Sequence, residues 1–351
     1  MSLTLKQEIQ TPGVQIGGAV FIALSILLGL SVGNMAAGVC FGLAAYAVVA
    51  NDAVQTLMTF INSNRDVKWQ WLYAGAAAVM VSALWWGWSQ NGGDISYGRL
   101  DAKGYTGVSV EWYMVIFPLI LIFLTKSRGV PVSTSLLMLS IFAGDLLFGQ
   151  IVIKSFAGYL VAFLSAYVLW LMVEASLKTR PPTTTKPHNL WRVAQWGTTG
   201  LLWWTWLSHD MVNMAVFLPS PLSGFQLALI TSIFLIGLAY TFWSQGGKIG
   251  NIVTKKTETD RVIAATLIDL VYFVVLLIFK EWNNIPMSTT WVFIGLMAGR
   301  EFAIRTINRL DPLPADQRFK AAYRLVWKDA SKVIFGLGVS VLALVVVRAI
   351  T

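Results

Sequence analysis

Charge, cysteine and histidine are all scarce in this chain of 351 residues. Charged residues make up 12% of the sequence, about half of the fraction that is usual in soluble domains. The single cysteine, Cys40, excludes a disulfide within the chain and a thiolate metal cluster. The two histidines exclude a polyhistidine metal site. The chain therefore lacks both the composition of a soluble domain and the ligands of those two metal centres.

Apolar residues are abundant instead, at 56% of the chain, and they include 16 tryptophans. Apolar runs of roughly 18 residues or more, the length that crosses a bilayer as a helix, recur from end to end. These runs do not alternate polar and apolar residues, which excludes an outer-membrane barrel. We therefore predict an all-α polytopic membrane protein. About eleven membrane elements are expected, at residues 14–33, 35–61, 70–89, 110–125, 131–150, 156–177, 192–218, 222–243, 261–279, 286–302 and 331–350.

The basic residues are distributed unevenly between the predicted loops. With a cytoplasmic N-terminus, 21 of the 26 Lys and Arg residues lie inside. Because cytoplasmic loops carry an excess of Lys and Arg, we predict an inside N-terminus and an outside C-terminus in a bacterial-type cytoplasmic (inner) membrane. Topology and lipid headgroups then account for the net charge of +9, and no nucleic-acid partner is expected. The basic segment 303–330 is expected to lie along the cytoplasmic surface.

Three landmarks recur in the same order along the chain. The sequence WSQ and a proline that opens a Ser-Thr motif each recur after 155 residues, and Asp52 has a counterpart in Asp210 after 158 residues. Each copy holds five predicted elements, and an odd number of crossings inverts the second copy. Inverted repeats with polar, interrupted segments are typical of secondary transporters, whose substrate site lies between the repeats. The predicted units are an extra N-terminal span (14–34), a first inverted repeat (35–177), a cytoplasmic linker (178–191) and a second inverted repeat (192–351), which includes 303–330.

The duplicated motif reads PVSTS at 131–135 and PMSTT at 286–290. Proline favours the first turn of a helix, so the hydroxyls that follow it are expected at a helix start. Free N–H groups, hydroxyls and the positive end of the helix dipole would converge there and bind an anion. The alternative is ordinary N-capping by Ser or Thr; the recurrence of the motif favours the anion site. The substrate candidates in the motifs are Ser133, Thr134, Ser135, Ser288, Thr289 and Thr290.

Carboxylates and amides inside apolar segments form a second duplicated pattern, since a polar side chain in a membrane needs a partner or a cavity. Such oxygens suit Na⁺, and a carboxylate can instead take up a proton. The alternative is that these side chains only join helices. The cation candidates are Asn51, Asp52, Gln55, Asp210, Asn213 and the mid-span Asp269. Asn51, His209 and Asn213 are also candidates for contact with the anion, and His209 is alternatively a proton carrier.

These motifs resemble those of the inorganic phosphate transporter (PiT) family, which carries two inverted copies of Gly-Ala-Asn-Asp…Asn and of Pro-x-Ser-Thr-Thr-His followed by spaced glycines. The resemblance covers both halves and implies cation-coupled uptake of a tetrahedral oxyanion, bound at the two Ser-Thr motifs. The family's histidine is replaced by Leu136 and Trp291, one of its asparagines by His209 and another by Gln55, and the linker is short. A site rich in donors favours sulfate, which cannot donate a hydrogen bond, so phosphate and sulfate are both left open as substrates.

The predicted function is therefore a symporter of phosphate or sulfate that works by alternating access, with Na⁺ or H⁺ as the coupling ion. No catalytic residue, enzyme activity or other cofactor is expected, and a homodimer is left open as the assembly. Two alternatives remain: an integral membrane enzyme that acts on phosphorylated lipid, and a passive anion channel. The enzyme would need a nucleophile–base pair or metal ligands near one membrane face, and the sequence offers no such cluster.

Overall fold

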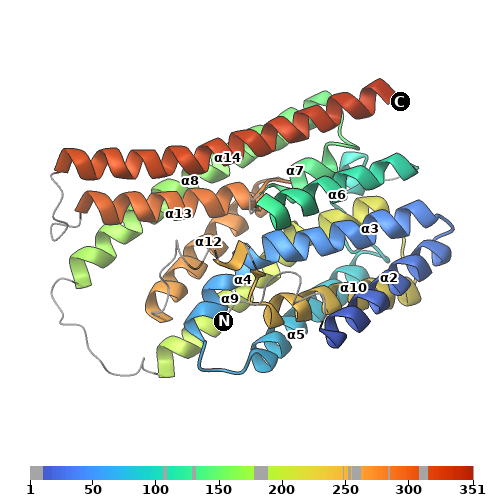
Figure 1. The fold of residues 1–351 in the computed structure, drawn as a ribbon, viewed down its shortest axis with the longest axis horizontal. Helices are drawn as coiled ribbons and strands as arrows, with labels where there is room; N and C mark the ends of the chain where they lie inside the picture. Colours follow the sequence, from blue (N-terminus) through green and yellow to red (C-terminus); the bar gives the residue numbers. More distant parts are fainter. Residues whose placement is uncertain are drawn as a thin grey trace.

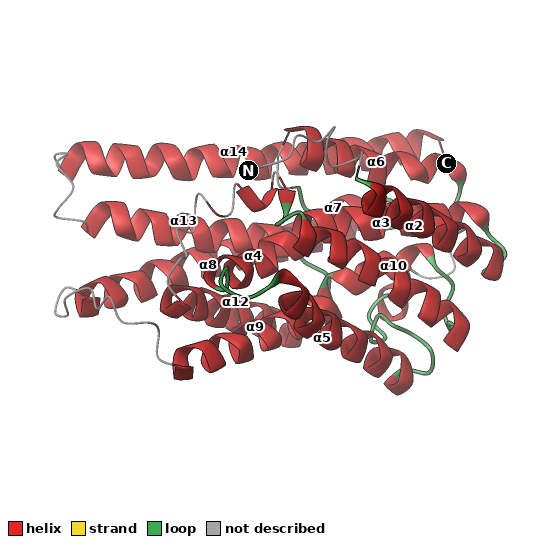
Figure 2. Ribbon diagram, turned by 60° about the horizontal axis from the view of Figure 1, so that its bottom comes forward, coloured by secondary structure: helices red, strands yellow, loops and turns green. Residues whose placement is uncertain are grey.

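The computed structural model describes residues 11–105, 109–128, 132–177, 189–247, 249–251, 254, 262–283, 285–307 and 315–350. Within these ranges the regular structure is helical, and Figure 2 shows no strand in them. Six of the described helical stretches are long and apolar enough to cross a membrane: Pro12–Ser31, Met35–Ser63, Leu146–Met172, Gly224–Trp243, Val262–Trp282 and Gln317–Ala349. The chain is thus built as a multi-pass helical membrane protein.

The first half of the chain begins with helices that start where the sequence offers a helix start signal. Pro12 stands at the first position of the first helix, and the side chain of Asn34 accepts a hydrogen bond from the N–H of Ala37 at the start of the next. The helices are α2 (Pro12–Ser31), α3 (Met35–Val48), the π-helical turn η1 (Val49–Ala53), α4 (Val54–Ser63), α5 (Trp69–Gln90), the 3₁₀ turns η2 (Asp101–Lys103) and η3 (Trp112–Val115), α6 (Ile116–Phe123), the π-helical turn η4 (Leu124–Arg128), α7 (Thr134–Leu139) and α8 (Asp145–Leu177).

The second half of the chain is also helical in its described residues. Its helices are α9 (Asn189–His209), the 3₁₀ segment η5 (Met211–Phe217), α10 (Gly224–Trp243), α12 (Val262–Trp282), α13 (Thr289–Ile307) and α14 (Ala315–Ile350). Figure 1 shows that the starts of α7 and α13 lie near the middle of the bundle, whereas α8 and α14 run along most of its length. The two Ser-Thr motifs are therefore carried to the interior of the protein.

Glycines allow α13 to lie against the backbone of α8. A methyl group on Gly299 would stand 2.1 Å from the carbonyl oxygen of Phe163, and one on Gly295 would stand 2.3 Å from that of Tyr159. Small residues one turn apart permit this close approach between membrane helices. The spaced glycines that follow the second Ser-Thr motif thus hold the start of α13 in place.

The predicted boundary between the elements at 131–150 and 156–177 was wrong, because the break lies at residues 140–144. The first of these contains only the six-residue helix α7 and the beginning of α8, and α8 then continues without a break to Leu177. Lys154, between the two predicted elements, belongs to α8, and its side chain is buried in the protein. Its ammonium group donates to the side-chain oxygen of Asn283 at 2.8 Å and to the carbonyl oxygen of Ile285 at 2.6 Å. Because the charge is satisfied by distant parts of the chain, the helix does not end there.

The segment 303–330 also differs from its prediction as a separate surface segment. Its described residues belong to the end of α13 and the beginning of α14, and α14 continues from Ala315 into the apolar stretch 331–350 as one helix. Residues 308–314, most of the predicted linker (178–188) and Pro131 of the first motif lie outside the described residues.

Candidate functional site

The first hydroxyl of each Ser-Thr motif is a helix N-cap. The side chain of Ser133 accepts a hydrogen bond from the N–H of Leu136 at 3.1 Å, and that of Ser288 accepts one from the N–H of Trp291 at 3.2 Å. The capping alternative therefore describes these two serines. The second and third hydroxyls of each motif point elsewhere, to two buried carboxylates.

Asp52 lies in the π-helical turn between α3 and α4, where it is 1% exposed. The hydroxyl of Thr134 donates to its Oδ2, and the hydroxyl of Thr290 donates to its Oδ1 at 2.6 Å. The side-chain amide of Asn51 also donates to Oδ1, at 2.9 Å. The two hydroxyls come from different motifs, so Asp52 joins the starts of α7 and α13.

Asp210 follows the last residue of α9 and is equally buried. The hydroxyl of Ser135 donates to its Oδ1, and that of Thr289 donates to its Oδ2. The amide of Asn213 donates to Oδ1 at 3.2 Å. The element predicted at 192–218 is thus interrupted at this aspartate and continues as 3₁₀ helix, which turns the carboxylate toward both motifs.

The hydrogen bonds of the two aspartates follow one pattern. Each carboxylate accepts one hydroxyl from the motif of its own half and one from the motif of the other half. Thr134 and Thr289 occupy equivalent positions, 155 residues apart, as do Ser135 and Thr290. We call these four hydroxyl residues together with Asp52 and Asp210 the central cluster.

Other predicted residues surround the central cluster and are not all satisfied. Gln55 donates from Nε2 to the side-chain oxygen of Asn51 at 3.0 Å, but its own Oε1 is buried without a hydrogen-bond partner in the described residues. The Nδ1 atom of His209 is also buried without one. No group of three or more His, Cys, Asp or Glu that could hold a metal occurs in the described ranges. The available ligand oxygens, from carboxylates, amides and hydroxyls, are of the hard kind that suits a cation such as Na⁺.

Asp269, in α12, forms a separate buried site. Its carboxylate accepts hydrogen bonds from the hydroxyls of Thr59, at 2.6 Å, and Thr199, at 2.5 Å. These three residues come from α12, α4 and α9 and share no hydrogen bond with the central cluster among the described residues. This aspartate has no counterpart in the first half of the sequence, and in the structure it lies apart from the paired pattern.

Three buried or half-buried basic residues close to His209 were not predicted as site residues. The guanidinium of Arg99 donates to the carbonyl oxygens of Ser208 and His209 and to the side-chain oxygen of Asn213, the last at 2.8 Å. The ammonium of Lys280 donates to the hydroxyl of Ser208 at 3.1 Å. Lys154, bonded to Asn283, is the third. The sequence did contain a signal for these site residues, because they are three of the few basic residues in segments predicted to lie on the outer side of the membrane.

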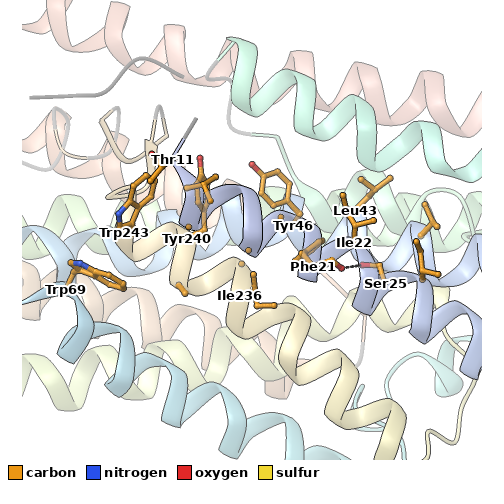
Figure 3. Close-up of a pocket in the computed structure, with 18 residues that line it drawn as sticks. Thr11, Phe21, Ile22, Ser25, Leu43, Tyr46, Trp69, Ile236, Tyr240 and Trp243 are labelled. Carbon is orange, nitrogen blue, oxygen red and sulfur yellow. Dashed lines mark hydrogen bonds between the residues drawn. The ribbon is translucent and has the colours of Figure 1, made fainter. Parts of the chain in front are cut away.

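An apolar groove of about 720 Å³ lies elsewhere, between α2, α3 and α10 (Figure 3). Phe21, Ile22, Tyr46, Ile236 and Tyr240 are among the residues that line it. None of its lining residues belongs to the central cluster, and its apolar walls do not suit an inorganic ion. The candidate ion site is therefore the buried central cluster and its surroundings.

No model of a known protein family matches the chain, and no curated protein sequence matches it. Among solved structures, the chain is similar to one titled "The sodium-dependent phosphate transporter", with a TM-score of 0.51 and 15% sequence identity. The similarity covers 90% of this chain and 99% of the other, so it extends over both halves. At this level of identity the similarity establishes a shared fold.

Proposed function

We propose that this protein is a cation-coupled symporter of an inorganic tetrahedral oxyanion, phosphate or sulfate, that works by alternating access. One observation carries the proposal: both Ser-Thr motifs meet both buried aspartates in one cluster. Buried carboxylates are costly in a membrane unless they serve a partner, a proton or an ion. The fold shared with a structure titled as a phosphate transporter agrees with this function.

Counting hydroxyl protons gives a physical basis for coupling. Each of the four hydroxyls of the central cluster has one proton to donate, and in this structure each donates it to a carboxylate. An oxyanion needs those same protons. A cation at a carboxylate, Na⁺ or H⁺, compensates its charge and releases the hydroxyls for the anion. Binding of the cation therefore prepares the site for the anion.

The architecture that we propose for this mechanism is a pair of inverted repeats, 35–177 and 192–351, with an inside N-terminus in a cytoplasmic-type membrane. Each aspartate accepts one hydroxyl hydrogen bond from each motif. A two-fold axis between the halves would produce this pattern, which supports the proposed architecture. The distribution of basic residues supports the orientation. In this arrangement the site lies between the repeats, where either half can open it to one side of the membrane.

Flux into proteoliposomes tests the function directly. Purified protein is reconstituted, a Na⁺ or H⁺ gradient is imposed, and uptake of radiolabelled phosphate and sulfate is measured side by side. Accumulation above the outside concentration, lost when the gradient is collapsed, is expected. Downhill flux alone would mean a passive anion channel. Absence of any flux in vesicles that contain folded protein would refute the proposal and favour a membrane enzyme or a scaffold.

A further inference from the structure

The two halves of the site differ in the groups beside their aspartates, and a guanidinium group lies in the Asp210 half. Arg99 is 5% exposed and donates to three oxygens: the carbonyl oxygens of Ser208 and His209 and Oδ1 of Asn213. All three belong to the chain on either side of Asp210. A group of two carbonyl oxygens and one amide oxygen beside a carboxylate is also what a monovalent cation would need. In this half the positive charge is supplied by the protein.

In the described residues, no guanidinium group donates to the equivalent place beside Asp52. The residue 158 positions before Asn213 is Gln55, and its Oε1, on a side chain 2% exposed, has no hydrogen-bond partner in the described residues. The residue 155 positions after Arg99 is Thr254, a neutral residue that bonds to Asn62 and to the carbonyl oxygen of Gly250. A buried acceptor oxygen without a donor is destabilising, and a bound cation would satisfy it.

The charged groups near the two aspartates also differ between the two halves. The charge of Arg99 interacts with the carboxylate of Asp210, and Lys280 lies on the same side, bonded to Ser208. Among the described residues, the donors to Asp52 are hydroxyl and amide groups, and the carboxylate of Asp210 acts on it electrostatically. The Asp210 half therefore contains cationic side chains of the protein, whereas no cationic side chain donates to Asp52 in the described residues, so a monovalent cation has a carboxylate left to balance at Asp52.

We propose that Arg99 is a built-in cation that fills the Asp210 half of the site, so that a monovalent coupling ion binds only in the Asp52 half, at the free oxygen of Gln55. This inference rests on the proposed function. A site with two equivalent halves would bind one cation in each. Under this proposal the chain uses one coupling cation fewer per anion than a site with two equivalent halves, because the guanidinium is fixed to the protein and cannot be transported.

The number of coupling cations per anion tests this assignment. In proteoliposomes it is obtained by finding the cation gradient that just balances an opposing anion gradient. Gln55→Leu removes the free oxygen and is expected to lower this number by one. Asn213→Leu is the matched change in the other half, where Arg99 supplies the charge, and it is expected to leave the number unchanged even if transport is slower. A reduction of the number by one in Asn213→Leu, as in Gln55→Leu, would overturn the assignment.

Arg99 itself gives a second measurement. Arg99→Lys keeps the charge and is expected to keep the wild-type number of cations per anion. Arg99→Gln removes the charge and is expected to raise that number by one, because the vacated oxygens can then hold an ion. An unchanged number in a folded Arg99→Gln variant would also overturn the assignment. If the wild-type protein accumulates neither phosphate nor sulfate, both the proposed function and this inference are refuted. If it accumulates one of them, the variants test only the assignment of Arg99.

Discussion

The division of work within each Ser-Thr motif leads to a quantitative prediction. The second hydroxyl of each motif, in Thr134 and Thr289, donates to a carboxylate of the central cluster. Replacement by valine keeps the shape of the side chain and removes only the O–H donor. The backbone N–H groups at the helix start remain in the variant, so the loss is limited to one hydrogen bond to a charged group. We expect oxyanion binding to weaken by about 1–3 kcal/mol for each single variant, roughly 5- to 150-fold.

The double variant Thr134→Val with Thr289→Val is expected to bind more weakly than either single variant, because under the proposed function both hydroxyls donate to one anion. Their effects need not be additive, since the two residues belong to one hydrogen-bonded network. The assay is equilibrium binding of radiolabelled phosphate and sulfate to the purified protein in detergent, with the coupling ion present. Thermal unfolding of each variant checks that the protein is folded at the assay temperature.

The first hydroxyl of each motif provides the matched control. Ser133 and Ser288 cap α7 and α13 and make no hydrogen bond to either aspartate among the described residues. Ser133→Ala and Ser288→Ala are expected to lower the free energy of unfolding by about 1 kcal/mol and to leave the affinity for the anion nearly unchanged. Wild-type affinity in the double valine variant, or an equal loss of affinity in the alanine controls, would show that the hydroxyls act only through folding.

Three further predictions follow from the same structure. Asp52→Asn and Asp210→Asn are each expected to abolish gradient-driven uptake in proteoliposomes while the protein remains inserted and monodisperse, and normal uptake with unchanged cation dependence would exclude these aspartates from coupling. Gly299→Ala places a methyl group against the backbone of α8 and is expected to lower the free energy of unfolding by about 1–3 kcal/mol, measured as a lower Tm. In the control Gly338→Ala the new methyl group meets nothing within 4 Å, and no loss of stability is expected. A topology reporter fused after Thr351 is expected to score as outside, and a cytoplasmic signal would contradict the inverted arrangement.

The sequence predicted the helical elements well where a local property determines them. A membrane-spanning helix needs a sufficient apolar length, and that length can be read from neighbouring residues. Helices α5 and α10 end at the two WSQ sequences, and the glycines that follow have positive φ angles, 98° at Gly93 and 73° at Gly246. The recurrence of both patterns identified the Ser-Thr motifs and the two aspartates as candidate residues, and the structure adds the hydrogen bonds that join them.

What the sequence could not predict depends on partners far along the chain. The continuity of α8 depends on Lys154, whose acceptors lie about 130 residues later, at Asn283 and Ile285. The role of Arg99 depends on carbonyl oxygens at Ser208 and His209, more than 100 residues away. In both cases a charged residue in the sequence suggests a solvent-exposed loop or a helix end, because local patterns do not show which distant oxygens will satisfy it. The folded chain buries these charges where acceptors are already present.

The arrangement of donors in the central cluster bears on how the two halves communicate under the proposed function. A cation at Asp52 releases the hydroxyls of Thr134 and Thr290, which belong to different motifs and therefore to different halves of the chain. One binding event in the first half thus changes what both helix starts can donate. An oxyanion that takes up the two released donors then holds α7 and α13 together. By linkage, the cation must tighten the anion as much as the anion tightens the cation. Under the proposed function the motif is needed twice, because a single copy could satisfy a carboxylate but could not link both halves to one ligand.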